Sequence, residues 1–376
     1  MHIFQLHKNL ISSVPRIDKK LDRISVPGYK LQNFNSKIFS NISAPNESNI
    51  SSEILMLKNV VMQFHKSYFN KKNSTLAVND VSFSIKNGEI MGLVGESGSG
   101  KSTLSMALMR LTRAPGRIAD GNIFLDDVDI LDLDVEEMRL SRLSKISLVP
   151  QGAMNSLNPV MRVGAQMSDA IKHHTKEKIS KKNLSARITV LLNSVGLNER
   201  VAQMFPHELS GGMKQRVAMA IATSMKPQII IADEPTSALD VVVQRQVVST
   251  LGRLQKEIGA SVVMIGHDMG LVSQFADMVG VMYAGKLIEL GPVIDIFKKP
   301  LHLYTRLLIS SLPNLDSKKE FKGIPGLPPL LIDLPEGCTF CQRVEGAKRN
   351  DGKDPEWTEV AKNHWVALCN DCVDLG

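Results

Sequence analysis

The chain has 376 residues, of which 43% are hydrophobic and 22% are charged, and its formal net charge is +7. It contains no run of about 18 apolar residues, which excludes a membrane-spanning helix and makes any role at a membrane peripheral. The basic excess is compatible with nucleic acid, anionic lipid or acidic substrates, but no dense run of Lys and Arg favours one of them. All four cysteines lie between residues 338 and 372, which argues against a disulfide-stapled secreted fold.

Residues 1–52 are rich in Asn, Ser, Ile and Lys and show no periodicity. Such a composition buries too little apolar surface to fold by itself. We expect this N-terminal extension to be either a disordered basic tail or the result of a wrongly assigned start, with Met56 as the true initiator.

Short apolar strands alternate with helical segments from Ile54 onward. Strands are predicted at residues 55–64, 77–85, 89–94, 145–150, 228–233 and 261–267, and helices at residues 101–110, 186–195, 212–225 and 242–258. A closing hairpin is predicted about Ala284 and Gly285. Because strands and helices alternate, we expect an α/β fold with a mainly parallel sheet that helices cover on both faces.

The predicted elements fall into two regions after the N-terminal extension. The main domain is expected at residues 53–300, and its more helical and charged part, about residues 152–208, is expected to form an inserted helical subdomain. After Pro300 the chain loses long elements and becomes rich in Pro and Gly. It ends in a small cysteine-containing extension, residues 301–376.

A phosphate-binding loop follows the predicted strand 89–94. Its spacing, G-x-x-x-x-G-K-S between a strand and a helix, is specific for nucleotide phosphates, whereas a plain Gly-rich turn needs neither flank. Glycines let backbone N–H groups close around phosphate oxygens, and the helix directs its positive end at them. Lys101 is expected to bridge the β- and γ-phosphates of ATP, and the Ser102 hydroxyl to bind Mg²⁺. The candidate ligands are Gly95, Ser97, Gly98, Ser99, Gly100, Lys101, Ser102 and Thr103.

A buried strand that ends in two carboxylates, QIIIADE at residues 228–234, supplies a second acidic site. Asp233 is expected to hold Mg²⁺ through water, and Glu234 to polarise the attacking water as the general base. The alternative is a strand end with ordinary solvated acids. A phosphate loop in the same chain favours the catalytic interpretation.

The segment LSGGMKQR at residues 209–216 resembles the signature motif of ABC ATPases and stands just before the acidic strand, as in that family. A helix that begins at this Gly pair offers free N–H groups and a positive dipole end. The resemblance implies that Ser210, Gly211 and Gly212 hold the γ-phosphate of the nucleotide on the opposite subunit's phosphate loop. It therefore implies a P-loop NTPase with an ABC-type nucleotide-binding domain that works as a head-to-tail dimer.

Further positions match the same family. Gln151 resembles the glutamine that senses Mg²⁺ and contacts the permease, and Asp240 ends a segment, SALD, that resembles the loop crossing the dimer interface. His267 resembles the switch histidine that contacts the γ-phosphate, although Gly266 stands where the family usually has Thr. Three aromatic residues are candidates for stacking on adenine, the first being preferred: Phe69, Phe64 and Tyr68.

Three segments narrow the resemblance to importers of oligopeptides, dipeptides and nickel. They are SLNP at residues 156–159, PLHLYT at residues 300–305, where Leu303 replaces the family's Pro, and GIPGLPPLLIDLPEGCTF at residues 323–340. The resemblance implies an ATP-hydrolysing subunit that energises import of peptides or a related small solute from the cytoplasmic face of the membrane. The implied partners are integral permease subunits, a second ABC ATPase subunit, identical or different, and indirectly an extracytoplasmic solute-binding protein.

An ABC-type ATPase of nucleic-acid repair or translation is the alternative function. Such proteins usually hold two ATPase cassettes or a long coiled-coil insertion, whereas this chain has one phosphate loop and no sustained heptads. We therefore expect no nucleic-acid partner.

The C-terminal extension carries two CxxC pairs, Cys338 with Cys341 and Cys369 with Cys372. Two such pairs can direct four thiolates at one centre, so a [4Fe–4S] cluster, Zn²⁺ and free thiols in a reducing cytosol all remain open. The resemblance implies a possible cluster site, because related importers can hold an iron–sulfur cluster in this extension. Only Cys338 and Cys369 align with the cysteines they use, and the family cysteines expected near residues 344 and 350 are absent.

Overall fold

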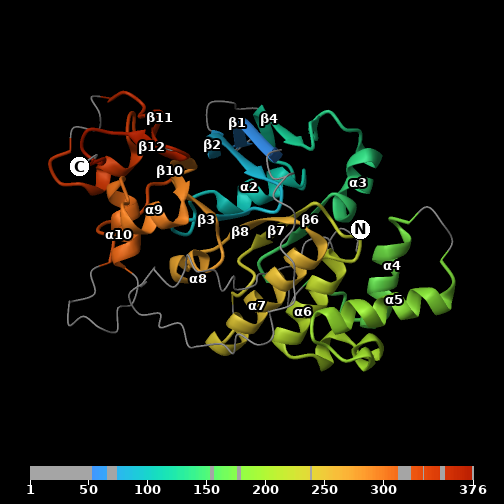
Figure 1. Ribbon diagram of the computed structural model, residues 1–376. Coiled ribbons are helices and arrows are strands. Elements are labelled where there is room, and N and C mark those ends of the chain that lie inside the picture. The colour runs from blue at the N-terminus through green and yellow to red at the C-terminus, as the bar shows by residue number, and fades with distance from the viewer. Residues whose placement is uncertain are drawn as a thin grey trace.

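The computed structural model describes residues 53–65, 74–152, 156–175, 179–237, 239–311, 323–332, 334–347 and 352–374 (Figure 1). The predicted N-terminal extension, residues 1–52, and the preferred adenine-stacking residue Phe69 lie outside these ranges. Within them, no helix combines the length and the apolarity that a bilayer crossing requires.

An eight-stranded sheet forms the centre of the molecule, in the order β11-β12-β10-β9-β3-β8-β7-β6. The five strands from β9 to β6 are parallel, and β10, β12 and β11 join antiparallel at one edge. This arrangement confirms the predicted α/β fold. The strands are β3 (Ile90–Val94), β6 (Ile146–Val149), β7 (Ile229–Asp233), β8 (Ser261–Ile265), β9 (Met278–Tyr283), β10 (Lys286–Pro292), β11 (Glu356–Ala361) and β12 (His364–Leu368).

Both faces of the parallel strands are buried, because β3, β6, β7 and β8 expose no residue. Alternate side chains enter two separate cores, as the pleat of a strand requires. Ile90 and Val94 pack on one face with the large helices, whereas Met91 and Leu93 pack on the other with α2 and a second sheet. These continuous apolar runs explain why the strands were recognisable in the sequence.

The second sheet is antiparallel, with the order β2-β1-β4-β5, and lies across α2 from the central sheet (Figure 1). Its strands are β1 (Glu53–His65), β2 (Ser74–Lys86), β4 (Gly116–Leu125) and β5 (Val128–Asp129). The first two lie where strands were predicted. The sequence analysis did not find β4, whose residues are mostly exposed or half-buried.

Helices cover the opposite face and fill the region between β6 and β7. The described part of the helical region predicted at about residues 152–208 contains two α-helices and two short 3₁₀ helices. The two α-helices and the first 3₁₀ helix contribute residues to the larger core cluster. The helices are α2 (Lys101–Leu108), α3 (Val135–Ser144), α4 (Val163–Lys172), α5 (Lys181–Ser194), η5 (Glu199–Gln203), η6 (Pro206–Glu208), α6 (Gly211–Ala222), α7 (Val241–Ile258), α8 (Met269–Ser273), α9 (Val293–Lys298), α10 (Leu303–Ser310) and η7 (Thr339–Arg343).

The C-terminal extension packs against the edge of the central sheet and adds two strands to it. The hairpin β11–β12 continues that sheet through the pair Leu290 and Trp365, and Trp357 stacks on Trp365 with ring centroids 6.4 Å apart. Figure 1 shows this hairpin and α10 at the same side of the molecule as β10. The sequence analysis predicted neither the hairpin nor α10.

Candidate nucleotide-binding site

The phosphate loop connects β3 to α2, and two of its glycines are required by close approach of the main chain. A Cβ on Gly95 (φ 148°) would lie 2.1 Å from the carbonyl oxygen of Met282, and one on Gly100 (φ 100°) would lie 2.2 Å from that of Ala77. The backbone N–H of Gly285 donates to the carbonyl of Ser99 at 3.0 Å. Main-chain atoms of both sheets therefore pack closely against the loop, and only glycine fits at these two positions.

Lys101 begins α2 and turns its amino group back into the loop. Its Nζ donates to the carbonyls of Gly95 and Glu96, both at 2.8 Å, and to Ser99 Oγ at 3.1 Å. Burial lowers the pKa of Lys101, while the carboxylates of Glu234 and Asp233 oppose that shift. A buried ammonium with carbonyl acceptors and no tight counterion is a strong site for an anion.

Asp233 ends β7 directly beside the first turn of α2. Its two carboxylate oxygens accept hydrogen bonds from Ser102 Oγ at 2.9 Å and from Ser105 Oγ at 3.0 Å. Burial raises the pKa of Asp233, and these two hydroxyls oppose the shift. Ser102 and Asp233 were predicted to hold one ion, whereas Ser105 was not predicted as a partner of Asp233. Its position one helical turn after Ser102 was the signal that could have indicated it.

The carboxylate of Glu234 contacts two other residues that the sequence predicted for the site. Gln151 Nε2 donates to one of its oxygens at 2.7 Å, and His267 Nδ1 lies 3.7 Å from the other. This contact with His267 lowers the pKa of Glu234, and the nearby carboxylate raises the pKa of His267. Residues that are 83 and 33 positions apart from Glu234 thus share one carboxylate.

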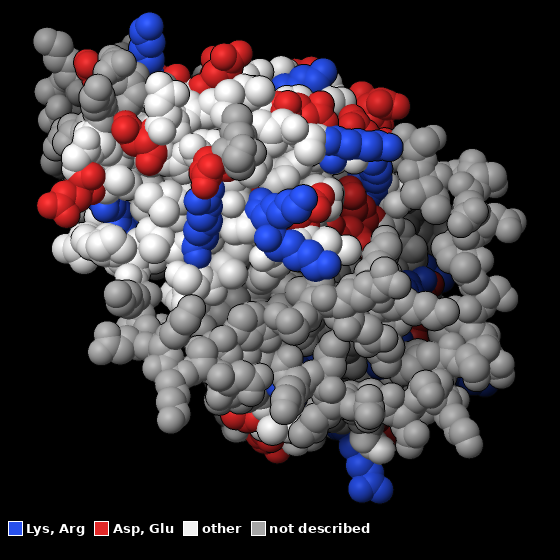
Figure 2. Space-filling view, turned by 60° about the vertical axis from the view of Figure 1, so that its left-hand side comes forward, with Lys and Arg blue, Asp and Glu red and all other residues white. Residues whose placement is uncertain are grey.

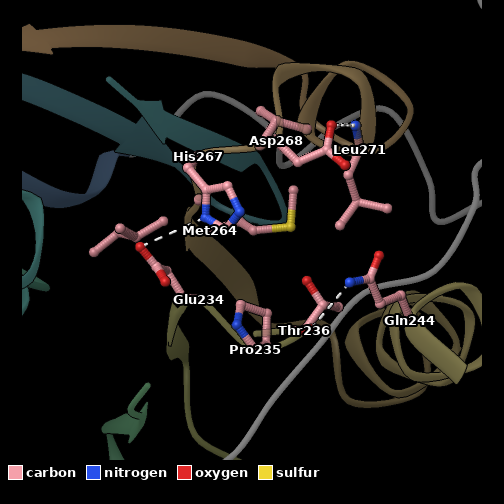
Figure 3. Close-up of a pocket in the computed structure, with 11 residues that line it drawn as sticks. Glu234, Pro235, Thr236, Gln244, Met264, His267, Asp268 and Leu271 are labelled. Carbon is pink, nitrogen blue, oxygen red and sulfur yellow. Dashed lines mark hydrogen bonds and ion pairs between the residues drawn. The ribbon is translucent and has the colours of Figure 1, made fainter. Parts of the chain in front are cut away.

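A pocket opens beside this group, and Figure 3 shows the imidazole of His267 directed toward the carboxylate of Glu234 at its edge. The pocket lies where the chain leaves β7 and β8, at the carboxyl ends of the parallel strands. Such edges are where open α/β sheets bind ligands. Its lining residues are Glu234, Pro235, Thr236, Gln244, Met264, Ile265, Gly266, His267, Asp268, Leu271 and Val272.

The LSGGM segment forms the capped start of α6. Ser210 is the N-cap residue, and its Oγ accepts from the backbone N–H of Met213 at 3.3 Å, while Gly211 and Gly212 form the first turn. Asp240 caps α7 in the same way, by accepting from Val242 and Val243. Within the described ranges, Ser210 makes no hydrogen bond to the phosphate loop of its own chain.

The four cysteines come together in one buried cluster. Their sulfur atoms all lie within 4.8 Å of one another, with Cys341 Sγ 3.4 Å from Cys369 Sγ and 3.3 Å from Cys372 Sγ. Cys338 Sγ is 3.9 Å from Cys372 Sγ, and none of the four forms a disulfide. Hydrogen bonds from Cys372 and then from His302 lower the pKa of Cys338 to about 3.

The chain resembles known proteins over most of its length. A family model described as ABC transporter matches residues 78–237, and one described as oligopeptide/dipeptide transporter, C-terminal region, matches residues 288–349. The oligopeptide transport ATP-binding protein OppD of Bacillus subtilis (strain 168) is 40% identical over 321 residues, covering 84% of this chain and 88% of the relative. The dipeptide transport ATP-binding protein DppD of Lactococcus lactis subsp. cremoris (strain MG1363) is 39% identical over 318 residues, covering 84% and 90%.

Solved structures show the same fold. A dimeric post-hydrolysis state of an ATP-binding cassette bound to ADP and Pi has 29% identity and a TM-score of 0.57, covering 64% of this chain and 98% of that one. The phosphate loop, the acid pair at the end of β7 and the capped helix α6 define an ATP-hydrolysing P-loop protein of the ABC type, a class that uses ATP with Mg²⁺. Within that class, the chain belongs to the ATP-binding proteins of oligopeptide/dipeptide ABC transporters.

Proposed function

We propose that the chain hydrolyses MgATP at this site to drive uptake of peptides or a related small solute through membrane permeases. The observation that carries the proposal is the convergence of Gln151 and His267 on Glu234, next to the buried pair of Asp233 and Ser102. The names of the two relatives, oligopeptide and dipeptide transport proteins, supply the solute class.

The phosphate loop and Asp233 would bind the nucleotide. Phosphate oxygens would replace the loop carbonyls as acceptors for Lys101, and Ser102 and Asp233 would hold Mg²⁺, which would neutralise phosphate charge. The remaining loop residues would donate backbone N–H groups: Gly95, Ser97, Gly98, Ser99, Gly100 and Thr103. Phe69 remains the prediction for adenine stacking.

Glu234 would act as the general base for the attacking water. Gln151 would orient the carboxylate and complete the Mg²⁺ environment, and His267 would contact the γ-phosphate as the reaction proceeds. Both neighbours hold the carboxylate in its charged form, which is the form that accepts a proton.

The γ-phosphate side of the site would come from a second subunit. Ser210, Gly211 and Gly212 form a helix start whose N–H groups and dipole suit an anion, yet they bind nothing of their own phosphate loop. Asp240 would lie at the seam of a head-to-tail pair. The dimeric state of the solved relative supports this arrangement.

The protein would bind peripherally at the cytoplasmic face of the membrane. Its direct partners would be integral permeases, and an extracytoplasmic solute-binding protein would act through them. On the face shown in Figure 2, described Lys and Arg side chains alternate with Asp and Glu rather than forming one basic surface. Together with the relatives, this does not favour the nucleic-acid alternative.

The test of the catalytic proposal is Glu234→Gln. This variant keeps the size of the side chain but cannot accept a proton, so it should bind ATP, dimerise and lose turnover by about 100-fold or more. Lys101→Ala should instead lose nucleotide binding. In proteoliposomes with its permeases, the wild-type protein should couple hydrolysis to peptide uptake. Turnover near the wild-type rate in Glu234→Gln would remove Glu234 from the role of base.

We further propose that the cysteine cluster holds one Zn²⁺. A tetrahedral Zn²⁺ with Zn–S bonds of about 2.3 Å sets its sulfurs about 3.8 Å apart. Three sulfur pairs, at 3.3, 3.4 and 3.9 Å, are near that spacing, and all four sulfur atoms lie within 4.8 Å of one another. A [4Fe–4S] cluster attaches each thiolate to a different iron, so it needs the sulfurs further apart. The ion would supply a structural cross-link between η7 and the turn at Cys369.

Metal analysis after anaerobic purification tests this assignment. We expect about one zinc per chain, lost in Cys341→Ser. Iron with acid-labile sulfide, or protein free of both metals, would contradict it.

A further inference from the structure

Arg343 ties the C-terminal extension to the phosphate loop. It is the last residue of η7, and its side chain is only 3% exposed. Its guanidinium donates to both carboxylate oxygens of Glu96, from Nη1 at 2.5 Å and from Nη2 at 3.2 Å. Glu96 directly follows Gly95, the first glycine of the loop. A buried forked pair of this kind fixes both the charge and the orientation of the carboxylate.

Tyr304 reaches the same loop residue from α10. Its hydroxyl accepts from the backbone N–H of Glu96 at 2.8 Å. Its ring packs between Tyr283 and Phe340, with centroid distances of 4.7 and 5.2 Å, so the hydroxyl has little freedom to move. The main chain and the side chain of Glu96 are therefore both held by residues that follow the ATPase core in the sequence.

Glu96 is the acid of the phosphate loop itself. The amino group of Lys101 donates to its carbonyl at 2.8 Å, and the nearby carboxylate of Glu96 acts to raise the pKa of the same amino group. The side chain of Glu96 is therefore close enough to influence a bound triphosphate. An unpaired carboxylate there would repel phosphate oxygens across a partly buried, poorly screened space. The pair with Arg343 compensates this charge.

The position of Arg343 depends on the extension. Cys338 caps η7, and Cys341 lies within it two residues before Arg343. The guanidinium also donates to the carbonyls of a Pro- and Gly-rich segment of the extension: Ile324, Pro325 and Gly326. The cysteine cluster and this segment thus hold the helix that presents the arginine.

We propose that Arg343 and Tyr304 are positioning residues of the nucleotide site, which hold Glu96 and thereby keep the phosphate loop open and attractive for ATP. The inference rests on the nucleotide site proposed above. It gives the C-terminal extension a direct part in ATP binding.

A double-mutant cycle on the full-length protein tests the pair, with MgATP affinity measured by calorimetric titration. Arg343→Ala should weaken binding by about tenfold, because it leaves the Glu96 carboxylate unpaired beside the phosphates. Glu96→Ala should cost less, and the double variant should bind as Glu96→Ala does. In steady-state assays, the loss should appear in KM, with kcat changed less than about twofold.

Two further variants make the result specific. Tyr304→Phe keeps the packed ring but removes the hydroxyl, and it should weaken ATP binding a few-fold. Arg306→Ala is the matched control: this arginine of the same extension pairs with Asp374 at 3.1 Å and should leave affinity unchanged.

The proposal is wrong if Arg343→Ala binds ATP as the wild type does. It is also wrong if Glu96→Ala fails to restore affinity in the Arg343→Ala background, since Arg343 would then only support the extension. In either case Lys101→Ala should still abolish binding, which separates this failure from failure of the nucleotide site itself.

Discussion

Glu234 leaves β7 in a conformation that residues with a side chain seldom adopt. Its φ is 45°, and its backbone N–H donates to the carbonyl of Ile265 at 2.9 Å, which holds the turn in place. This turn interrupts the alternation of the strand. Asp233 therefore contacts the hydroxyls of α2, while the adjacent Glu234 contacts Gln151 and His267.

We predict that His267 titrates above its ordinary pKa in the nucleotide-free protein. The nearby carboxylate of Glu234 raises the pKa of His267 from about 6.5. Glu234→Gln removes the negative partner, so the pKa of His267 should fall back toward that value. NMR titration of the imidazole C–H signals in both proteins measures the change. Equal pKa values in the two proteins would show that the pair does not form.

The same pair gives stability a defined pH dependence. The contribution of His267, whose folded pKa is raised, is complete below about pH 6.5 and is lost as pH rises through the folded pKa. The contribution of Glu234, whose folded pKa is lowered, is complete above about pH 4.5 and is lost as pH falls through the folded pKa. The difference in unfolding free energy between the wild type and Glu234→Gln should therefore be largest between these limits.

Site residues that follow predicted strands could be named from the sequence. Asp233, Glu234, Gln151 and His267 each come at or just after a strand end, and parallel strands bring those ends to one edge. The bond from Arg343 to Glu96 joins residues 247 positions apart. No periodicity or motif links them, because the pairing depends on how the extension docks on the sheet.

One buried carboxylate joins three elements of the C-terminal region. Glu289 on β10 is fully buried and accepts from the backbone N–H groups of Leu301 at 2.8 Å and His302 at 3.0 Å. It also contacts Nε2 of His364 on β12 at 2.9 Å. The sheet edge, the segment before α10 and the terminal hairpin therefore depend on this side chain.

We predict that Glu289→Ala destabilises the protein by about 3 kcal/mol or more, because it leaves three buried groups without their partner. Denaturant unfolding measures this loss, and alkylation of the four cysteines should become faster as the extension loosens. Glu356→Ala, at an exposed position of β11, is the control and should change stability by no more than about 0.5 kcal/mol. Wild-type stability and alkylation rates in Glu289→Ala would show that the extension is held elsewhere.

The elements of the central sheet were predictable, whereas the terminal hairpin was not. The strands β3, β7 and β8 are short apolar runs because both faces are covered. In β11 exposed and half-buried residues alternate without a clear apolar face. Its place is fixed by pairing with β12 and by the stack of Trp357 on Trp365, which are tertiary contacts.

The molecule as a whole carries both halves of the proposed ATP site, and the two halves do not contact each other within the described part of the chain. The phosphate loop and the acid pair meet within one chain, while Ser210 bonds only to its own helix in the part of the chain that the structure describes. The N–H groups at the start of α6 can be satisfied by water in the free protein, and together with the helix dipole they suit an anion. Because one chain does not bring the two halves together, we infer that a second subunit supplies the γ-phosphate side of each nucleotide site.

We therefore predict that two inactive variants restore each other when mixed. Lys101→Ala removes the phosphate loop's cation, and Gly211→Asp places a negative charge where the γ-phosphate would bind. In a head-to-tail dimer of both variants, one site combines an intact loop with an intact LSGGM helix. Random pairing makes half of the dimers mixed, each with one working site of two, so ATPase should return to about a quarter of the wild-type rate. A mixture as inactive as its components would show that two copies of this chain do not share their sites.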